Sequence, residues 1–373
     1  MNSAAKTKKK VKNRLKSNII KGTLILSCAS ILSRIIGFIY RIYLADILGE
    51  QLLGTYQLIF PIYVLCFTIY GAGMQSAISQ VVATLIGKNN THSKDDGLKG
   101  SVSKDITPRT ILLAGTILSF ILALFLSIFI NFNSKWIACN ILMVPDCDIY
   151  LKLLTYLFPF CSISACICGY QYGLENAKPP AIAGIIEQIT RILFVFIVQG
   201  FFSDKEICCQ IAVYGLTVGE FFGFLYNMST IKNKKRNNKK HISDKNLNND
   251  NAKLHSESLH SKRQHAYNAK SDNQQFKRQE LKNKTFNKRK NKISLKESFK
   301  LLLPVFISLT SIKLTISLLH SVESIFIPAS LVKYGYTMNE ALSVYGIYSG
   351  MAMPFIMFPA TIAMAISTML LPA

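Results

Sequence analysis

Long runs of apolar residues, separated by blocks of charge, constrain this chain more than any other feature of its sequence. Half of its 373 residues are hydrophobic, yet it has 43 Lys and Arg residues against 20 Asp and Glu residues. In a water-soluble helix or strand the polar residues would alternate with the apolar ones at a short period, whereas here each kind fills its own segments. This pattern is typical of a chain that crosses a membrane several times. We therefore predict an all-α, polytopic bundle of membrane helices.

Windows of about 20 apolar residues, which suffice to cross a hydrocarbon core of about 30 Å, identify the candidate spans. Eight such windows lie at residues 19–44, 53–86, 110–131, 150–172, 181–202, 208–230, 299–328 and 341–371. The second is too long for one straight crossing, and Pro61, Gly71 and Gly73 are positions where it can bend. In the last window, Pro354 is expected to act as a further kink.

The distribution of basic residues predicts the orientation of the chain. The segment 1–18 is strongly basic, which places the N-terminus on the cytoplasmic side because positively charged loops stay inside. The remaining loops then fit one alternating topology with both ends inside. The predicted organisation is a basic tail at 1–18, a six-span lobe at 19–230, a linker at 231–298, and two spans of a second lobe at 299–373.

The linker at 231–298 differs in composition from the rest of the chain. It is rich in Lys, Arg, Asn, Ser and Gln, so it cannot bury enough apolar surface to fold alone. We interpret it as a disordered cytoplasmic segment that fixes the topology and attracts anionic lipids of the inner leaflet. Nucleic-acid binding is the alternative, since basic tracts neutralise phosphates. The linker has only Tyr267, Phe276 and Phe286 for base stacking, so we expect no nucleic-acid partner.

The segment after the linker echoes the first lobe. The motif LGTY at 53–56 leads after 21 positions to AIS at 77–79, and LSVY at 342–345 leads after 20 positions to AIS at 365–367. Each pair of motifs encloses an apolar, proline-containing stretch. The echo is either accidental or the trace of an internal duplication, and in the second case residue 299 begins a new copy of the first lobe.

Two arginines lie within the first predicted span. Arg34 is about 15 residues into it, hence about 20 Å deep at 1.5 Å per residue, which is beyond easy snorkelling. Because a charge at that depth costs about 2.5 to 3.5 kcal/mol on insertion scales, Arg34 is expected to face the bundle interior or a wet cavity. Arg41 follows seven residues later on nearly the same helical face. The alternatives to ligand binding are a structural ion pair for Arg34 and snorkelling to the outer headgroups for Arg41.

Other charged residues at membrane depth extend this pattern. Glu187 and Arg191 are spaced i,i+4 in the fifth span, where they can form an ion pair that either stabilises the helix or lines a cavity. Lys313 lies near the middle of the seventh span. Cationic side chains grouped around a central cavity suit an anionic ligand, and guanidinium groups suit phosphate best.

Motifs for bond-making chemistry are absent from the sequence. We find no Ser/His/Asp set, no Gly-rich phosphate-binding loop and no pair of metal ligands at a suitable spacing. We therefore expect that the protein is not an enzyme, and we predict neither a cofactor nor a metal site.

Three stretches of the sequence resemble a known family. They are KGTLILSCASILSRIIGFIYRIYLADILGEQLLGTYQLIFPIYVLCFTIYGAG, GYQYGLENAKPPAIAGIIEQITRI and YGIYSGMAMPFIMFPATIAMAISTMLLPA. They are similar to the stage V sporulation protein B and polysaccharide-biosynthesis flippases of the multidrug/oligosaccharidyl-lipid/polysaccharide exporter superfamily. The resemblance implies a two-lobed transporter of the cytoplasmic membrane that moves undecaprenyl-linked sugar or peptidoglycan precursors outward by alternating access. Family members have more spans than the eight predicted here, so the chain resembles a C-terminally truncated member.

The resemblance also implies roles for individual residues. Arg34, within the family's Ser-Arg-Ile-Ile-Gly-Phe element, would contact the pyrophosphate of the lipid, with Arg41 and Lys313 extending the attraction. The supporting polar residues of the cavity would be Gln171, Glu187, Gln188, Arg191 and Glu323. The alternatives are an inactive or partial family member, a membrane scaffold, and a drug or cation antiporter of the same superfamily. The antiporter would favour carboxylates within the membrane.

Overall fold

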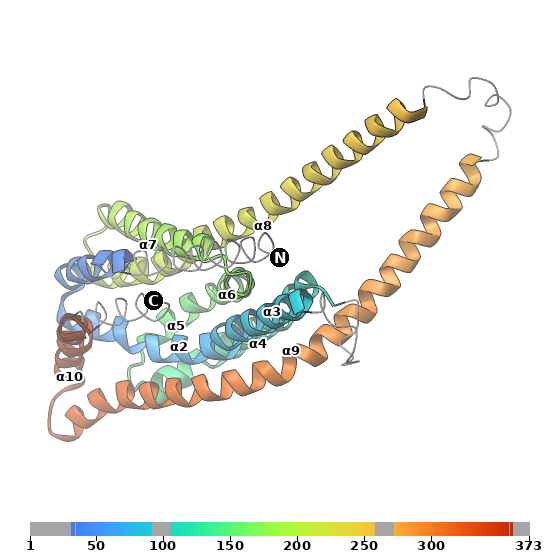
Figure 1. The fold of residues 1–373 in the computed structure, drawn as a ribbon. Helices are drawn as coiled ribbons and strands as arrows, with labels where there is room; N and C mark the ends of the chain where they lie inside the picture. The colour runs from blue at the N-terminus through green and yellow to red at the C-terminus, as the bar shows by residue number, and fades with distance from the viewer. Residues whose placement is uncertain (1–30, 34, 92–105, 258–271, 358, 361–373) are drawn as a thin grey trace, which may run out of the picture.

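The computed structural model describes residues 31–33, 35–91, 106–257, 272–357 and 359–360. Over these residues the chain is built of helices and contains no β-strand. The helices form a bundle from which two long helical extensions project (Figure 1). The predicted all-α class is confirmed.

Several helices of the described part of the chain are long and apolar enough to cross a membrane. There are five, or six if one bent pair counts as a span, namely Ile31–Gly87, Pro108–Ile141, Lys178–Gln199, Lys205–Lys232, Leu295–Lys333 and the pair Cys147–Thr155 with Phe158–Gly173. The first has 57 residues, about 85 Å at 1.5 Å per residue, which is nearly three hydrocarbon thicknesses. It therefore holds both of the first two predicted spans. They meet at Gly49, whose φ of +73° only a glycine adopts easily.

The second predicted span is irregular where bending was expected. It contains α2 (Phe60–Phe67), the π-helix η1 (Thr68–Ala72) and α3 (Gly73–Thr91). Pro61 lies in the first turn of α2, where its missing N–H is tolerated. Gly71 belongs to η1, and a Cβ at Gly73 would overlap the side chain of Thr310. The glycine at 73 thus lets two helices approach closely.

The next three predicted spans correspond to four helices. α4 (Pro108–Trp136) begins with a capping box between Thr107 and Thr110 and continues into the π-helix η2 (Ile137–Ile141). α5 (Cys147–Thr155) and α6 (Phe158–Gly173) meet at an angle of 48°. α7 (Lys178–Gln199) follows.

The linker differs from its prediction. α8 (Lys205–Glu257) runs on well past the sixth predicted span, and α9 (Asp272–Lys333) begins before the seventh, with residues 258–271 outside the described residues. In Figure 1 these polar extensions project away from the bundle. No regular structure was expected in these extensions. A packed span has already nucleated each helix, so the helix can continue at little cost, because Lys, Arg, Gln and Glu are good helix formers.

The last described helices are short. α10 (Met338–Tyr345) leads into the π-helix η3 (Gly346–Ala352), and Pro354 lies just after it in a further helical turn. The main chains of the two echoing segments touch here, since a Cβ at Gly54 would overlap the Leu342 carbonyl and a Cβ at Gly346 would overlap that of Glu50. Residues 361–371 of the eighth predicted span lie outside the described residues.

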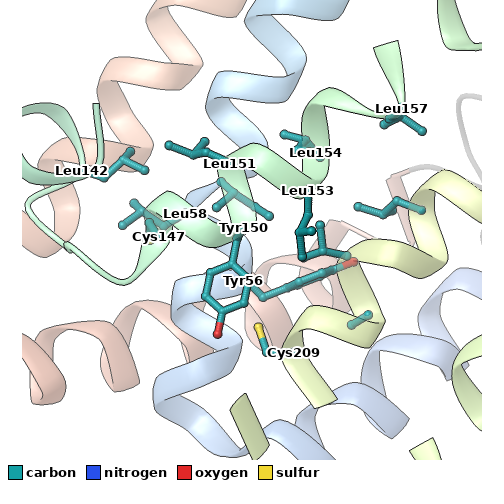
Figure 2. Packing of buried hydrophobic residues seen from close by; sticks show 14 of the residues in the cluster. Tyr56, Leu58, Leu142, Cys147, Tyr150, Leu151, Leu153, Leu154, Leu157 and Cys209 are labelled. Carbon is teal, nitrogen blue, oxygen red and sulfur yellow. The ribbon is translucent and has the colours of Figure 1, made fainter. Parts of the chain in front are cut away.

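Among the described residues there are two buried clusters, and the larger surrounds α5. Leu151 and Cys147 of this helix are fully enclosed, and they belong with Tyr56 of the second span and Cys209 of α8 to the cluster drawn in Figure 2. Because most residues of α5 are buried, this helix lies inside the bundle. Close packing of this kind holds membrane helices together, since lipid tails are as apolar as the side chains.

Candidate functional site

A row of polar contacts joins α9 to the second span. The Ser321 hydroxyl donates to the main-chain carbonyl of Pro61 at 3.1 Å, and the hydroxyls of Ser317 and Thr68 are 2.7 Å apart. Ser317 and Ser321 are both buried and lie one helical turn apart on the same face of α9. We call this row the α9 seam.

Lys313 continues the α9 seam by one more turn. Its Nζ donates to the main-chain carbonyl of Ala72 at 2.8 Å and to the hydroxyl of Ser76 at 2.6 Å. The hydroxyl of Ser76 also donates to the Ala72 carbonyl, at 3.1 Å. The structure therefore places Lys313 between α9 and the junction of η1 and α3. An ammonium group has three donors, so one remains for a ligand.

A second polar group lies between α7 and α8. Arg191 and Glu187 form an ion pair at 2.5 Å, with side chains 15% and 27% exposed. Glu220 of α8, buried at 9% exposure, lies within electrostatic range of both. Two carboxyl groups thus lie near one guanidinium, of which that of Glu187 is bonded to it, and the Nε of Arg191 has no hydrogen-bond acceptor among the described residues. We call these three residues the acid–arginine cluster.

Glycines on α8 make this cluster possible. Gly215, Gly219 and Gly223 repeat every four residues and face α7, and a Cβ at Gly219 would lie 2.7 Å from the Glu187 carbonyl oxygen. Small residues at this spacing let two membrane helices pack backbone to backbone. The short distance between α7 and α8 is what brings Glu220 next to the ion pair.

The arginines of the first span are only partly described. Arg41 is exposed, and its guanidinium lies within electrostatic range of Tyr56 and Arg191, so it faces the edge of the acid–arginine cluster. Arg34 lies outside the described residues.

The remaining predicted site residues are dispersed. Gln171 is 2% exposed, donates to Thr230 at 3.4 Å and accepts from Asn176 at 3.3 Å. The bond to Thr230 connects α6 to α8, and the bond to Asn176 fixes the loop that follows α6. Gln188 is half-buried on α7. Glu323 is exposed on α9, with its carboxylate 3.6 Å from Nδ1 of His320.

A cavity of about 270 Å³ opens beside the α9 seam. We call it the α2–α9 cavity, and it lies between α2, α9, α10 and η3. It is lined by Gln57, Phe60, Pro61, Val64, Ser317, His320, Ser321, Ser324, Tyr345 and Ser349.

Sequence reasoning missed several residues that the structure brings into these sites, among them the serines of the α9 seam, Glu220 and Gln57. Glu220 is a carboxyl group within the sixth predicted span, and an ionisable residue at that depth is itself a signal of function. Gln57 is a weaker signal, because a single amide in an apolar stretch is common.

Comparisons with known proteins agree with the family resemblance. The sequence matches the family model described as polysaccharide biosynthesis protein over residues 19–254. It is 25% identical to the stage V sporulation protein B of Bacillus subtilis, a match that covers 96% of this chain and 58% of the relative. It is 24% identical to the lipid II flippase MurJ of Bacillus subtilis, over 57% of this chain and 39% of the relative. The chain thus spans less than two thirds of each.

The fold is also similar to that of a solved structure. A transporter of the MOP superfamily from Pyrococcus furiosus superposes with a TM-score of 0.51 at 14% identity, covering 89% of this chain and 63% of the other. At this identity the likeness shows the fold alone.

Proposed function

Because the chain belongs to the polysaccharide biosynthesis protein family, we propose that it acts in moving an undecaprenyl-linked sugar or peptidoglycan precursor across the cytoplasmic membrane. One relative is named a lipid II flippase and another a sporulation protein, so the precursor would serve cell-wall or spore-cortex synthesis. The many apolar helices make the chain a membrane protein, and in our proposal its N-terminus is cytoplasmic.

The observation that carries this proposal is the α9 seam. In our domain assignment α9 begins the second lobe, and an alternating-access transporter must open and close the interface between its lobes around a site near the bilayer midplane. The contacts of Ser317 and Lys313 with the second span are polar rather than close-packed apolar. Hydroxyl and ammonium groups can exchange these partners for water or for an anion when the interface opens.

The phosphates of the lipid would meet Arg34, Arg41 and Lys313. Lys313 has one donor left after its bonds to Ala72 and Ser76, and Arg41 is an exposed residue of the first span. The acid–arginine cluster, together with Gln171 and Gln188, would support the helices around this path. Pro61, Gly71, Gly73 and Pro354 would let them bend, and the basic segment 231–298 would attract anionic lipids.

Complementation in cells tests the proposal. The chain would be expressed in a strain depleted of its precursor flippases, with growth and precursor accumulation followed and membrane insertion verified. We expect rescue by the wild type, loss of rescue by Arg34→Ala and Lys313→Gln, and retention of rescue by Lys333→Gln, a change of an exposed lysine at the end of α9. A correctly inserted wild-type chain that gives no rescue would refute activity of this chain alone.

A second candidate, cation-coupled antiport, is favoured by one observation. The acid–arginine cluster holds two carboxyl groups against one guanidinium, so a proton or a metal cation would balance its charge. Proteoliposomes with an imposed pH gradient would show cation exchange that Glu220→Gln abolishes. Unchanged exchange in that variant would remove the candidate.

A further inference from the structure

Gln57 is the residue of the α2–α9 cavity that the fold itself leaves unused. It is only 9% exposed, it lines the cavity, and within the described part of the chain its amide has no hydrogen-bond partner. The amide of Gln57 is not among the fully enclosed polar atoms that lack a partner, so it opens into the cavity, where water or a ligand can bond it. A ligand can therefore bind this amide without breaking any bond of the fold.

The other free groups around the cavity have the same chemistry. Ser324 and Ser349 are half-buried, line the cavity, and have no side-chain hydrogen bond within the described residues. Together with Gln57 they give two hydroxyls and one amide, converging from α9, η3 and the second span. All three can both donate and accept.

Aromatic and apolar groups form the rest of the wall. Phe60 and Tyr345 lie on the side of α2 and α10, with Pro61 and Val64 beside them. A sugar ring has hydroxyls on its edge and C–H groups on its faces, so it matches a wall of amide and hydroxyl groups next to aromatic rings.

The charge of the cavity excludes the other ligand classes. None of the ten lining residues is Lys, Arg, Asp or Glu, and the imidazole of His320 is exposed and turned to Glu323 at 3.6 Å. A phosphate would lack a cation and a metal ion would lack a carboxylate. At about 270 Å³ the cavity is below the range of about 300 to 1,000 Å³ that holds drug-sized ligands. Its size fits one ring rather than an oligosaccharide.

We propose that the α2–α9 cavity binds one uncharged sugar ring of the lipid-linked precursor, through Gln57, Ser324 and Ser349. This inference rests on the proposed function. It also agrees with the position of Lys313, because Ser317 of the cavity wall follows it by one helical turn, about 6 Å along α9. A diphosphate at Lys313 would therefore place the sugar attached to it at the mouth of the cavity.

Binding of a soluble sugar tests the site without any transport. We would measure saturation-transfer NMR on the purified chain in detergent with methyl N-acetyl-β-glucosaminide as the probe. We expect a signal that Gln57→Leu weakens by about three- to tenfold, the effect of one lost hydrogen bond. Ser349→Phe should abolish it by filling the cavity, and Ser308→Phe, on an exposed face of α9, should leave it unchanged.

Two results would overturn the sugar site. One is the absence of a wild-type signal, and the other is a signal that survives in Ser349→Phe. Displacement of the sugar by inorganic pyrophosphate, with equal affinity in Gln57→Leu, would also refute it, because it would show an anion site instead.

A vesicle assay separates this inference from the proposed function. Reconstituted protein would be given undecaprenyl diphosphate with and without one attached N-acetylglucosamine, and movement between leaflets would be measured for each. If Gln57→Leu slows only the sugar-bearing lipid, the sugar site is supported. If the wild type moves neither lipid but binds the soluble sugar, the transport proposal fails and the sugar site stands. If the wild type moves both and Gln57→Leu matches it, the sugar site fails and transport stands.

Discussion

The ammonium of Lys313 donates to the main-chain carbonyl of Ala72 at 2.8 Å, across 241 residues of sequence. The same carbonyl accepts the hydroxyl of Ser76, so one oxygen joins a side chain of its own helix and a side chain of α9. While the interface is closed to water, such a bond is retained because no other partner is available to replace it. It connects the first span of the proposed second lobe to the point where the second span changes from π-helix to α-helix.

Replacing Lys313 by methionine should weaken the attachment of α9. The change keeps an unbranched side chain, one atom shorter, and removes two charge-assisted hydrogen bonds, which are worth about 1.5 to 3 kcal/mol each to a charged group when no other partner replaces them. We expect the free energy of unfolding in detergent, measured by denaturant titration, to fall by that order. Lys333→Met, at an exposed lysine, is the control. Equal stability of the two variants would contradict the prediction.

Removing Arg191 should be more damaging than removing an exposed cation. Arg191→Met leaves the carboxyl groups of Glu187 and Glu220 together without a guanidinium. Because the ion pair is partly buried, its loss should cost between about 1 kcal/mol, the upper value for exposed pairs, and the about 3 to 5 kcal/mol of a fully buried pair. Lys152→Met breaks an i,i+4 pair with Asp148 whose lysine is 39% exposed, and exposed pairs contribute about 0 to 1 kcal/mol.

The yield of inserted protein and its unfolding free energy measure this difference. If Arg191→Met and Lys152→Met lose the same stability, the acid–arginine cluster is not a buried charge group. The double variant Arg191→Met with Glu187→Gln should recover part of the loss, because it removes one unbalanced carboxylate.

The contact between α7 and α8 should tolerate no side chain at Gly219. A Cβ there would lie 2.7 Å from the Glu187 carbonyl oxygen and 3.1 Å from Cβ of Arg191. Gly219→Ala must push the helices apart, at a cost of about 1 to 3 kcal/mol. Gly184→Ala on α7, where nothing lies within 4 Å of the added Cβ, should be neutral or slightly stabilising. Thermal unfolding of the two alanine variants compares them directly.

The stability of the first turn of α10 should depend on pH through the carboxyl group of Glu340. The main-chain N–H and the hydroxyl of Thr337 both donate to its carboxylate at 2.8 Å, and these bonds lower the pKa of Glu340 below its ordinary value. Because the folded pKa is lowered, the stabilisation is fully present above the unfolded pKa of about 4.3 and is lost as the pH falls through the folded value.

An NMR titration of labelled glutamate carboxyl groups measures this shift. In Thr337→Val the hydroxyl donor is gone, so the pKa of Glu340 should rise toward its ordinary value. A titration curve that is identical in the wild type and in Thr337→Val would exclude a contribution of this hydroxyl.

The positions of the membrane helices were largely readable from the sequence. Apolar runs at 110–131 and 181–202 correspond to Pro108–Trp136 and Lys178–Gln199, because burial in lipid requires apolar residues over the whole crossing. The break within the fourth predicted span was missed. α5 and α6 meet at 48° just before Pro159, which lies in the first turn of α6, and a proline marks a place where a helix can break without fixing whether it does.

The sites were less predictable, because their partners are distant in sequence. The ion pair of Glu187 with Arg191 followed from its i,i+4 spacing, and the structure contains it. Glu220 joins that pair only through the packing of α7 on α8, which no local pattern reveals. The bonds of Lys313 to the second span depend equally on tertiary packing, and its part in binding phosphate stays a prediction.

The approach of Gly54 to the main chain around Leu342, and of Gly346 to that of Glu50, has a mechanical consequence. Main chain meets main chain here, and neither Gly54 nor Gly346 carries a side chain that would interlock with the other segment, so the two segments can rotate relative to each other. The contact joins two stretches whose sequences echo each other, so each stretch contributes one half of the pivot about which the lobes would rotate. When the two lobes of our proposal move against each other, the α9 seam separates, whereas the contact between Gly54 and Gly346 stays closed throughout the movement.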